Sequence, residues 1–299
     1  MVYTLKRIKS HMDGHAIHYL EFNQNFHKGT VMIVHGMEDD KYRYEEVASM
    51  LFSRGFNVFV VDIRGHGDSP VDDIHGYFGE NHGWLYQLRD MKQMVDMINE
   101  EIILVGHSMG SLFVRSFLKR YPYSVKKVVL SGTPAYQIIS SVTKNGLKLL
   151  SRNERVKKSQ NHLVQKIMFD SFNKGVKNSK TQMDWLSFDE KNVSNYLDNP
   201  LCGQALTTQG FIDLFELLED ANNSKALVNA KREIDVLFMS GLHDLCGLID
   251  KKGLQSAVDV VKKWGYDAEL FLYERSRHEI FFDVEKDQVL FDLVNFVDR

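Results

Sequence analysis

The sequence has 299 residues, of which 43% are hydrophobic and 26% are charged, values that are ordinary for a folded chain and exclude a disordered one. The formal net charge of −3 gives no general electrostatic reason to expect a nucleic-acid partner. Two cysteines, Cys202 and Cys246, are too few for a disulfide framework, so a reducing compartment is expected. Apolar runs such as 58–61 and 102–105 are far too short to span a bilayer, and the first residues lack the apolar stretch of a signal peptide. We therefore expect a cytoplasmic protein.

Short β-branched runs alternate with helical patterns along most of the chain. The runs predicted to be strands are 30–34, 57–61, 101–105, 126–130, 235–239 and 269–273. The patterns predicted to be helices between and after them are 44–54, 85–99, 111–121, 254–264 and 286–297. Strands that are apolar on both faces and alternate with helices predict an α/β fold, with a mostly parallel sheet covered on both sides. Near the start, residues 3–8 and 16–22 alternate in polarity and are expected to pair antiparallel.

The alternation breaks down between residues 134 and 233, where the pattern is helical with few β-branched runs. We interpret 134–233 as an inserted helical cap (lid) over the carboxyl edge of the sheet, and 1–133 together with 234–299 as the α/β core. An independent helical domain with its own partner is the alternative.

The inserted part is unusually basic. Ten Lys and Arg residues fall between 144 and 180 against two acids, Glu154 and Asp170, which is an excess of eight positive charges (10 − 2). A basic face beside apolar side chains could make transient contact with the anionic headgroups of a membrane surface. An ordinary solvated charged face is the alternative.

The segment Gly106-His107-Ser108-Met109-Gly110 lies between a predicted strand and a predicted helix. A serine at so sharp a turn takes a strained conformation that projects its hydroxyl above the sheet, and the two glycines avoid collisions with the neighbouring chain. The start of the next helix directs N–H groups toward developing negative charge. This context predicts that Ser108 is a nucleophile, with a structural serine in a tight turn as the alternative.

A serine hydroxyl needs a base that removes its proton and an acid that orients the base. With such an elbow the acid and then the base follow the serine along the chain, which leaves three histidines: His162, His243 and His278. His162 falls among polar residues and is expected on the surface, and no later partner suits His243. His278 and Asp244 follow the last two predicted strands, at the edge where the sites of such sheets gather. They are the predicted base and acid, with Asp250 as the reserve acid.

Acyl transfer also needs hydrogen-bond donors for the oxyanion of the tetrahedral intermediate. The N–H of Met109, directly after the nucleophile, is one expected donor. The second should come from the loop after strand 30–34, and we assign it to the N–H of Met37. Core packing is the alternative role for the Met37 side chain.

These motifs resemble those of the monoacylglycerol lipase and lysophospholipase-like branch of the α/β-hydrolases, which includes serine aminopeptidase-like relatives. The motifs that carry the resemblance are His35-Gly36 followed by Tyr44, residues 62–69, residues 106–110, and Arg277-His278-Glu279. The resemblance runs from about Lys28 to the C-terminus outside most of the insertion. It implies a helical cap, carboxylic ester hydrolysis, and neither a metal nor an organic cofactor. Ser111 departs from the second glycine of many relatives, and Leu245 and Cys246 from their proline and valine, which affects elbow packing and pocket shape.

We therefore expect a serine hydrolase that cleaves esters with a lipid-like acyl chain, such as a monoacylglycerol or a lysophospholipid, through an acyl-enzyme on Ser108. The apolar residues expected to hold the chain are Ile138, Ile139, Val142, Phe211, Leu214 and Phe215. One alternative is an aminopeptidase-like amidase, which would need an acidic group facing the site. Another, from a different class, is a non-catalytic ligand-binding protein on the same fold. The natural acyl chain, the headgroup and the oligomeric state stay open.

Overall fold

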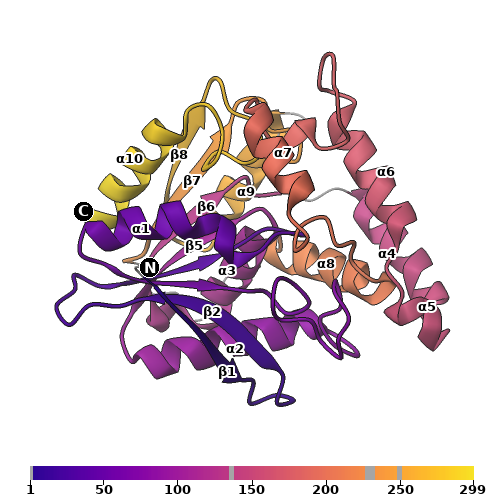
Figure 1. Cartoon of the computed structure of the whole chain (residues 1–299), viewed down its shortest axis with the longest axis horizontal. Coiled ribbons are helices and arrows are strands. Elements are labelled where there is room, and N and C mark those ends of the chain that lie inside the picture. The colour runs from indigo at the N-terminus through magenta and orange to yellow at the C-terminus, as the bar shows by residue number, and fades with distance from the viewer. Residues whose placement is uncertain (1–2, 135–137, 226–232, 248–250) are drawn as a thin grey trace.

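The computed structural model describes residues 3–134, 138–225, 233–247 and 251–299, which fold around one central sheet (Figure 1). In this part of the chain the sheet has eight strands in the order β1-β2-β4-β3-β5-β6-β7-β8. The strands are β1 (Thr4–Lys9), β2 (Ala16–Phe22), β3 (Thr30–Val34), β4 (Asn57–Val61), β5 (Ile102–His107), β6 (Val125–Ser131), β7 (Asp235–Gly241) and β8 (Asp267–Tyr273). β2 pairs antiparallel with β1 and β4, and all pairs from β4 across to β8 are parallel. The predicted mostly parallel sheet with an antiparallel N-terminal pair is confirmed.

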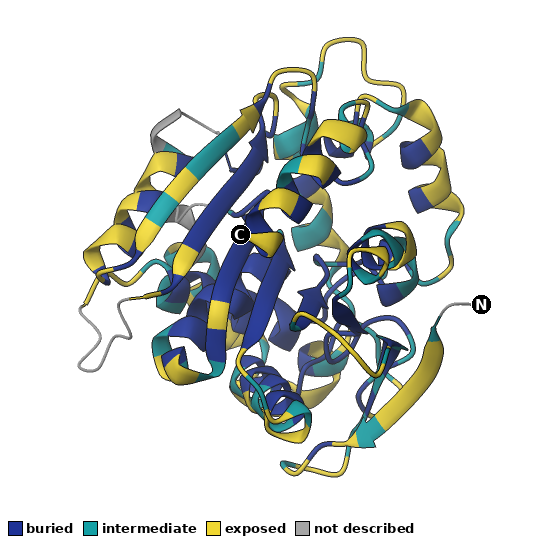
Figure 2. Ribbon diagram, turned by 90° about the vertical axis from the view of Figure 1, so that its left-hand side faces the viewer, coloured by how far each residue is buried: buried dark blue, intermediate teal, exposed yellow. Residues whose placement is uncertain are grey.

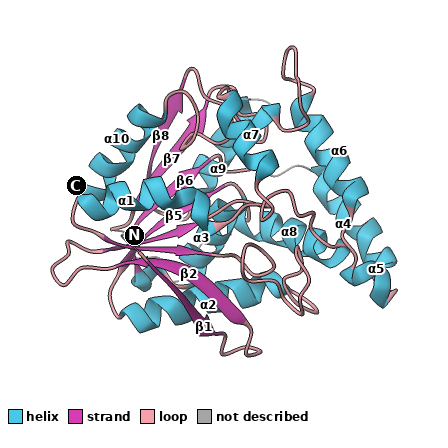
Figure 3. Ribbon diagram, in the orientation of Figure 1, coloured by secondary structure: helices cyan, strands magenta, loops and turns pink. Residues whose placement is uncertain are grey.

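Helices cover both faces of the sheet (Figure 3). In chain order, the helices of the described residues are α1 (Glu45–Ser53), α2 (Gly83–Ile98), α3 (Met109–Arg120), α4 (Ile138–Leu150), α5 (Glu154–Lys158), α6 (His162–Asn173), α7 (Glu190–Asp198), α8 (Thr208–Ala221), α9 (Lys251–Lys263) and α10 (Lys286–Asp298), with 3-10 turns η1 (Lys41–Tyr44), η2 (Pro122–Ser124) and η3 (Asp184–Leu186). Helices α1 and α10 share one apolar cluster with the sheet, and α2, α3 and α9 share the other. The expected two-sided cover is therefore present.

The middle strands are buried along their whole length, whereas β1 is exposed at the sheet edge (Figure 2). Every residue of β3, β4 and β5 is buried, as expected for β-branched runs that face helices on both sides. Because β3, β5, β6, β7 and β8 are parallel neighbours, their carboxyl ends meet at one edge. This edge positions the loops that carry the predicted site residues.

Two element boundaries differ from the sequence prediction around the elbow. The strand predicted at 101–105 continues to His107, and the helix predicted at 111–121 begins at Met109. The turn therefore consists of Ser108 alone, since its unusual backbone angles connect strand to helix directly. Glycine at both flanks hid these ends, because glycine is unfavourable inside regular elements when judged from propensity.

Helices α4 to α8 lie between β6 and β7, within what we call the inserted segment (residues 134–233). Its last helix, α8, is buried in the same apolar cluster as α3, and the side chains of Phe211 and Leu217 are wholly inaccessible there. In Figure 1, α4, α5 and α6 lie farthest from the sheet, at the right-hand side. None of the helices described is long and apolar enough to pass through a bilayer.

Most of the positive charge counted along residues 144–180 is compensated in the fold by nearby acids. Of the ten basic residues between 144 and 180, six form ion pairs: Lys144 with Glu219, Lys148 with Glu216, Lys157 with Glu80, Lys158 with Asp72, Lys166 with Asp170, and Lys180 with Glu190. Most of these acids lie outside the 144–180 window, so a count along the chain missed them. Within the described residues no ion pair is recorded for Arg152, Arg155, Lys174 or Lys177, all of which are exposed.

Candidate active site

Ser108 occupies the turn between β5 and α3 with φ 50° and ψ −119°, a conformation that residues other than glycine rarely adopt. Its N–H donates to the carbonyl of Ser131 at 2.8 Å, which ties the turn to β6. A Cβ on Gly110 would lie 2.1 Å from the carbonyl oxygen of Val34, and one on Gly106 would lie 2.7 Å from the carbonyl oxygen of Gly110. Both glycines are therefore required for this close approach, as the sequence predicted.

Asp244 and His278, which follow β7 and β8, are in direct contact. The two carboxylate oxygens of Asp244 lie 3.0 and 3.1 Å from Nδ1 of His278, and both residues are buried. Burial alone would lower the pKa of His278, but the charge and hydrogen bond of Asp244 outweigh it and raise the pKa. For Asp244, burial opposes ionisation, but His278 and the N–H groups of Cys246 and Gly247 lower its pKa. The pair thus favours a carboxylate beside an imidazole that readily takes up a proton.

Ser108 and His278 line the same small cavity, of about 20 Å³, at the carboxyl edge of the sheet. The rings of His107 and Trp185 pack against the imidazole of His278, with centroids 4.8 and 4.9 Å away. Burial lowers the pKa of His107 to about 3, so this neighbour stays neutral. Gly132 adjoins the imidazole too, since a Cβ there would lie 3.1 Å from its Nδ1. His278 is thus enclosed, with Ser108 on the same cavity wall.

An ionic network forms the polar side of this small cavity. The guanidinium of Arg43 donates two bonds of 2.7 Å to the carboxylate of Glu279 and one of 2.9 Å to Asp39. Burial opposes ionisation of Asp39, but Arg43 overcomes it and holds the pKa at about 2. Asn192 of α7 donates to Glu279 at 2.8 Å, so the network joins the core to the inserted segment. Both carboxylates line the cavity next to Ser108.

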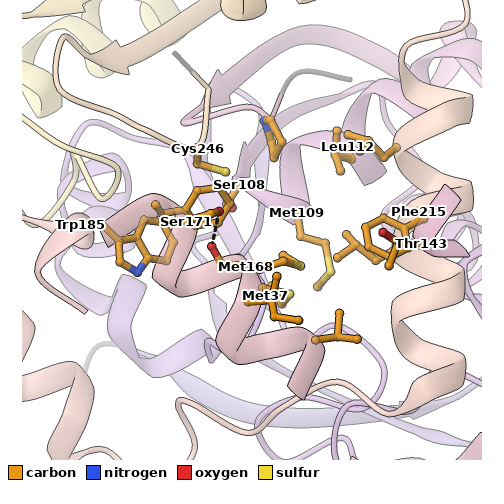
Figure 4. A pocket seen from close by; sticks show the side chains of 16 residues that line it. Met37, Ser108, Met109, Leu112, Thr143, Met168, Ser171, Trp185, Phe215 and Cys246 are labelled. Carbon is orange, nitrogen blue, oxygen red and sulfur yellow. Dashed lines mark hydrogen bonds between the residues drawn. The ribbon is translucent and has the colours of Figure 1, made fainter. Parts of the chain in front are cut away.

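A second, larger cavity of about 420 Å³ opens beside Ser108 and is lined mostly by apolar side chains (Figure 4). Its lining residues are Met37, Ser108, Met109, Leu112, Pro134, Thr143, Val164, Ile167, Met168, Ser171, Phe172, Trp185, Leu214, Phe215, Leu218 and Cys246. Figure 4 shows Ser108, Cys246 and Trp185 on one side and Thr143 and Phe215 on the other. The cavity therefore runs from the nucleophile candidate toward α4, α6 and α8.

The six apolar residues expected to hold an acyl chain have different positions in the structure. Leu214 and Phe215 line the large cavity, as expected. Phe211 is instead wholly buried in the core, and Val142 is 69% exposed. Composition alone does not indicate which face of each helix points toward the cavity. The side chains of Ile138 and Ile139 lie outside the described residues.

Met37 and Met109 both border the large cavity next to Ser108. Met109 is the first residue of α3, where N–H groups have no partner within the helix. Met37 lies in the loop after β3 and also borders the small cavity. Ser111, the departure from the family pattern, donates its hydroxyl to the carbonyl of Ser108 at 2.5 Å.

The rejected histidines lie away from this centre. His162 is exposed at the start of α6, beside Gln165. His243 is exposed and packs edge-on against Phe188. Asp250, the reserve acid, lies outside the described residues.

One group of metal-ligand residue types occurs in the described part of the chain, formed by Asp39, Asp40 and Cys202. Asp39 is bound to Arg43, and Asp40 accepts from Asn199 at 2.7 Å. Burial raises the pKa of the Cys202 thiol, which donates to a carboxylate oxygen of Asp40 at 3.5 Å. These internal bonds account for the group without an ion.

Sequence reasoning missed Asp39, Arg43 and Trp185 at the site. Asp39 and Arg43 lie within eight residues of His35-Gly36, and a charged pair directly after that motif was the available signal. Trp185 lies in the inserted segment, where no repeating pattern indicates which residues face the core. Its position follows from tertiary packing alone.

The sheet order and the turn between β5 and α3 define the α/β-hydrolase fold. Similar solved structures include a carboxyl esterase from Bacillus coagulans, with TM-score 0.88 and 19% identity, covering 100% of this chain and 98% of that chain. A monoacylglycerol lipase from Paleococcus ferrophilus has TM-score 0.71 and 20% identity, covering 94% and 98%. The model of the serine aminopeptidase S33 family matches residues 25–285, and the chain belongs to this family.

Two lipases are among the relatives whose sequences are similar to this chain. The monoacylglycerol lipase of Mycolicibacterium smegmatis is 25% identical over 284 residues, which are 90% of this chain and 88% of the relative. The human monoglyceride lipase is 33% identical over 93 residues, 28% of this chain and 27% of the relative. The chain is thus on the monoacylglycerol lipase-like branch of the family and is a carboxylic ester hydrolase.

Proposed function

We propose that the protein hydrolyses carboxylic esters with a lipid-like acyl chain, of the monoacylglycerol or lysophospholipid type, through an acyl-enzyme on Ser108. The observation that carries the proposal is the apolar cavity of about 420 Å³ that opens beside Ser108. An apolar cavity of this size suits an acyl chain, since its burial is favourable by about 0.8 kcal/mol for each CH₂ group.

In the proposed reaction, His278 accepts the hydroxyl proton of Ser108 while the oxygen of Ser108 attacks the ester carbonyl carbon. The N–H groups of Met37 and Met109 stabilise the oxyanion. The intermediate collapses as the ester C–O bond breaks, and protonated His278 gives its proton to the departing alkoxide. A water molecule then attacks the acyl-enzyme, His278 takes its proton, and the fatty acid leaves as Ser108 is reprotonated.

We assign the two cavities to the two sides of the ester. The acyl chain occupies the large apolar cavity, and the alcohol leaves toward the small cavity, where Asp39 and Glu279 offer polar contacts. His278 lines the small cavity, which suits its delivery of a proton to the alkoxide. Trp185 borders both cavities and covers the imidazole.

We further propose that residues 134–233 are a cap continuous with the core, and that its outer face contacts lipid surfaces transiently. Leu149 is 62% exposed on α4, and on α6 Leu163 and Ile167, one helical turn apart, are 70% and 61% exposed. Ile167 also lines the large cavity, so this exposed face borders the cavity mouth. Such a position would let a lipid move from a membrane into the site.

An amidase that recognises a free amino terminus is the second candidate, and the acids of the small cavity favour it. Asp39 and Glu279 supply two carboxylates next to Ser108, the acidic feature that such an enzyme requires. Both are bonded to the single cation Arg43, which leaves one negative charge on the network. The ester proposal is preferred because the larger cavity is apolar and carries no charged residue among its lining side chains.

A substrate panel tests the proposal. Initial rates would be measured on monoacylglycerols and lysophospholipids, on p-nitrophenyl esters of rising chain length, and on aminoacyl anilides. We expect turnover of esters with medium or long chains, little turnover of anilides, and none by Ser108→Ala. Faster cleavage of anilides would favour the amidase, whereas ligand binding without turnover of any activated ester would indicate a non-catalytic protein.

A further inference from the structure

A buried carboxylate follows the loop after β8 that carries His278, residues 274–280, which we call the histidine loop. Within the described part of the chain, its hydrogen bonds all come from backbone N–H groups. Asp283 is 1% exposed. One oxygen accepts from the N–H groups of Phe188 and Val284, each at 2.8 Å, and of Asp189 at 3.2 Å. The other oxygen accepts from the N–H of Arg277 at 2.7 Å. Asp283 thus joins the residue before His278 to the inserted segment.

The two neighbours of His278 have further bonds to the same stretch of the inserted segment. The guanidinium of Arg277 donates to the carbonyls of Asp184 at 2.6 Å and Ser187 at 2.8 Å. The N–H of Glu279 donates to the carbonyl of Leu186 at 2.8 Å. The imidazole is therefore attached on both sides to residues 184–189.

The same stretch covers the imidazole. Trp185 lies within residues 184–189, and its ring centroid is 4.9 Å from that of His278. A shift of this stretch would therefore move both the attachment and the cover of His278. The single carboxylate of Asp283 bonds to this stretch through the N–H groups of residues 188 and 189, and to the histidine loop through the N–H of Arg277.

We propose that Asp283 is a positioning residue, which holds His278 in place by bonding the histidine loop to residues 188 and 189 of the inserted segment. The inference rests on the proposed function, in which His278 is the base. Asp283 does not touch the reacting atoms. It acts through the backbone on either side of the imidazole.

Because all four hydrogen bonds to the Asp283 carboxylate come from N–H donors, Asp283→Asn is an informative substitution. Only a carboxylate accepts hydrogen bonds at both of its oxygens, whereas an amide of the same shape has one acceptor and one NH₂ donor. In Asp283→Asn the NH₂ group must face either the N–H of Arg277 or the N–H groups on the other side. One set of buried donors then loses its acceptor, and the connection through residue 283 is broken on that side, which leaves the bonds of Arg277 and Glu279 to hold the loop.

The test compares Asp283→Asn with wild type and with Asp287→Asn, the same exchange at an exposed position on α10. The pH dependence of kcat and kcat/KM on p-nitrophenyl butyrate would be measured, together with the thermal unfolding temperature. Since misplacement of a catalytic group by about 1 Å costs up to about 100-fold, we expect Asp283→Asn to lower kcat at least about ten-fold. Asp287→Asn should match wild type.

The pH dependence of kcat/KM distinguishes a positioning role from a mere loss of folded protein. Its acid limb, the pH range in which the rate falls as His278 becomes protonated, reports the pKa of the imidazole. His278 is faced by Asp244 from the loop after β7, by Glu279, by Asp39 from the loop after β3, and by His107 at the end of β5. If the imidazole moves away from Asp244 but stays buried, its pKa falls. The acid limb of kcat/KM should then move to lower pH. A smaller folded fraction would reduce the rate and leave the limb unchanged.

A second variant keeps the inference testable if Asp283→Asn does not fold. Arg277→Met removes the two bonds to Asp184 and Ser187 from a partly exposed side chain and retains its apolar stem. We expect a loss of about three- to ten-fold in kcat, with the limb shifted in the same direction. Wild-type kcat and an unmoved limb in the folded variants would overturn the inference. Absence of ester turnover by wild type would instead refute the proposed function, and the inference with it.

Discussion

The imidazole of His278 is buried between a carboxylate and two aromatic rings, and this environment decides its acid–base behaviour. Burial acts to lower its pKa, but the carboxylate of Asp244 has the larger, opposite effect. The pKa of His278 is therefore above the ordinary value of 6.5. The neutral form is the one that accepts a proton from Ser108. The rate of a reaction that needs this form must fall as the pH drops through the raised pKa.

We therefore predict that kcat/KM has an acid limb whose midpoint lies above pH 6.5. The measurement is a pH–rate profile on a short ester whose ionisation does not change in this range. A limb centred below pH 6 would contradict the assigned environment of His278.

Glu38 is a second titrating group, outside the proposed reaction. Burial raises the pKa of its carboxyl to about 7. The side-chain hydrogen bond from Gln165 on α6 acts in the opposite direction but is outweighed. Because the folded pKa exceeds the ordinary value of 4.5, the protonated folded state is favoured. The contribution of Glu38 to the free energy of unfolding is therefore fully present below pH 4.5. It decreases as the pH rises from 4.5 to 7 and is lost above pH 7.

Glu38→Gln removes this dependence. We predict that it stabilises the protein by about 1–3 kcal/mol at pH 8.5 and much less at pH 5, where Glu38 is already mostly neutral. Chemical denaturation at the two pH values measures the difference. An equal effect at both pH values would show that Glu38 is not the titrating group.

At the scale of elements, the sequence predicted the core much better than the inserted segment. Strands such as β3 and β4 matched their prediction residue for residue, because apolar runs between turn residues leave little freedom. The positions of Ser108, Asp244 and His278 at one edge follow from a parallel sheet in the same way. What failed was the register of the inserted helices: neither the buried Phe211 nor the exposed Val142 could be assigned from composition.

The contacts of the inserted segment also connect residues far apart in the chain. Trp185 and His278 pack together although 93 positions separate them, and the bond from Phe188 to Asp283 spans 95. No local periodicity reports such pairs. They depend on how α7 and η3 pack on the core, which a single sequence does not encode in its pattern.

Helix α8 contributes three side chains to the large cavity, and its residue Leu218 offers a test of chain accommodation. Leu218→Trp adds volume to the cavity wall and shortens the space for an acyl chain. We predict that kcat/KM for long-chain p-nitrophenyl esters falls about ten-fold or more, while that for acetate or butyrate esters changes less than about two-fold. Equal losses on short and long chains would mean that the acyl chain binds elsewhere.

At the scale of the whole molecule, the inserted segment is largely neutralised by ion pairs, so any membrane contact must come mainly from apolar exposure. Leu149 and Leu163 are each more than 60% exposed. The exposed cations Arg152, just before α5, and Arg155, in its first turn, can supplement this contact with anionic headgroups.

We predict that the double variant Leu149→Ser, Leu163→Ser binds phosphatidylglycerol vesicles roughly 5- to 30-fold more weakly, corresponding to about 1–2 kcal/mol of lost apolar burial. Its rate on soluble p-nitrophenyl butyrate should be unchanged. Phe291→Ser, at an exposed position on α10, is the matched control. Vesicle sedimentation with graded salt separates the apolar from the ionic part, and equal binding by both variants would refute the assigned surface.

Labelling of the nucleophile tests the central claim most directly. A fluorophosphonate probe forms a covalent bond with an activated serine oxygen, and intact mass with peptide mapping locates the adduct. We predict one adduct per chain on Ser108, absent in Ser108→Ala and much slower in His278→Ala. Labelling of wild type and Ser108→Ala to the same extent, or an adduct on another residue, would contradict the account.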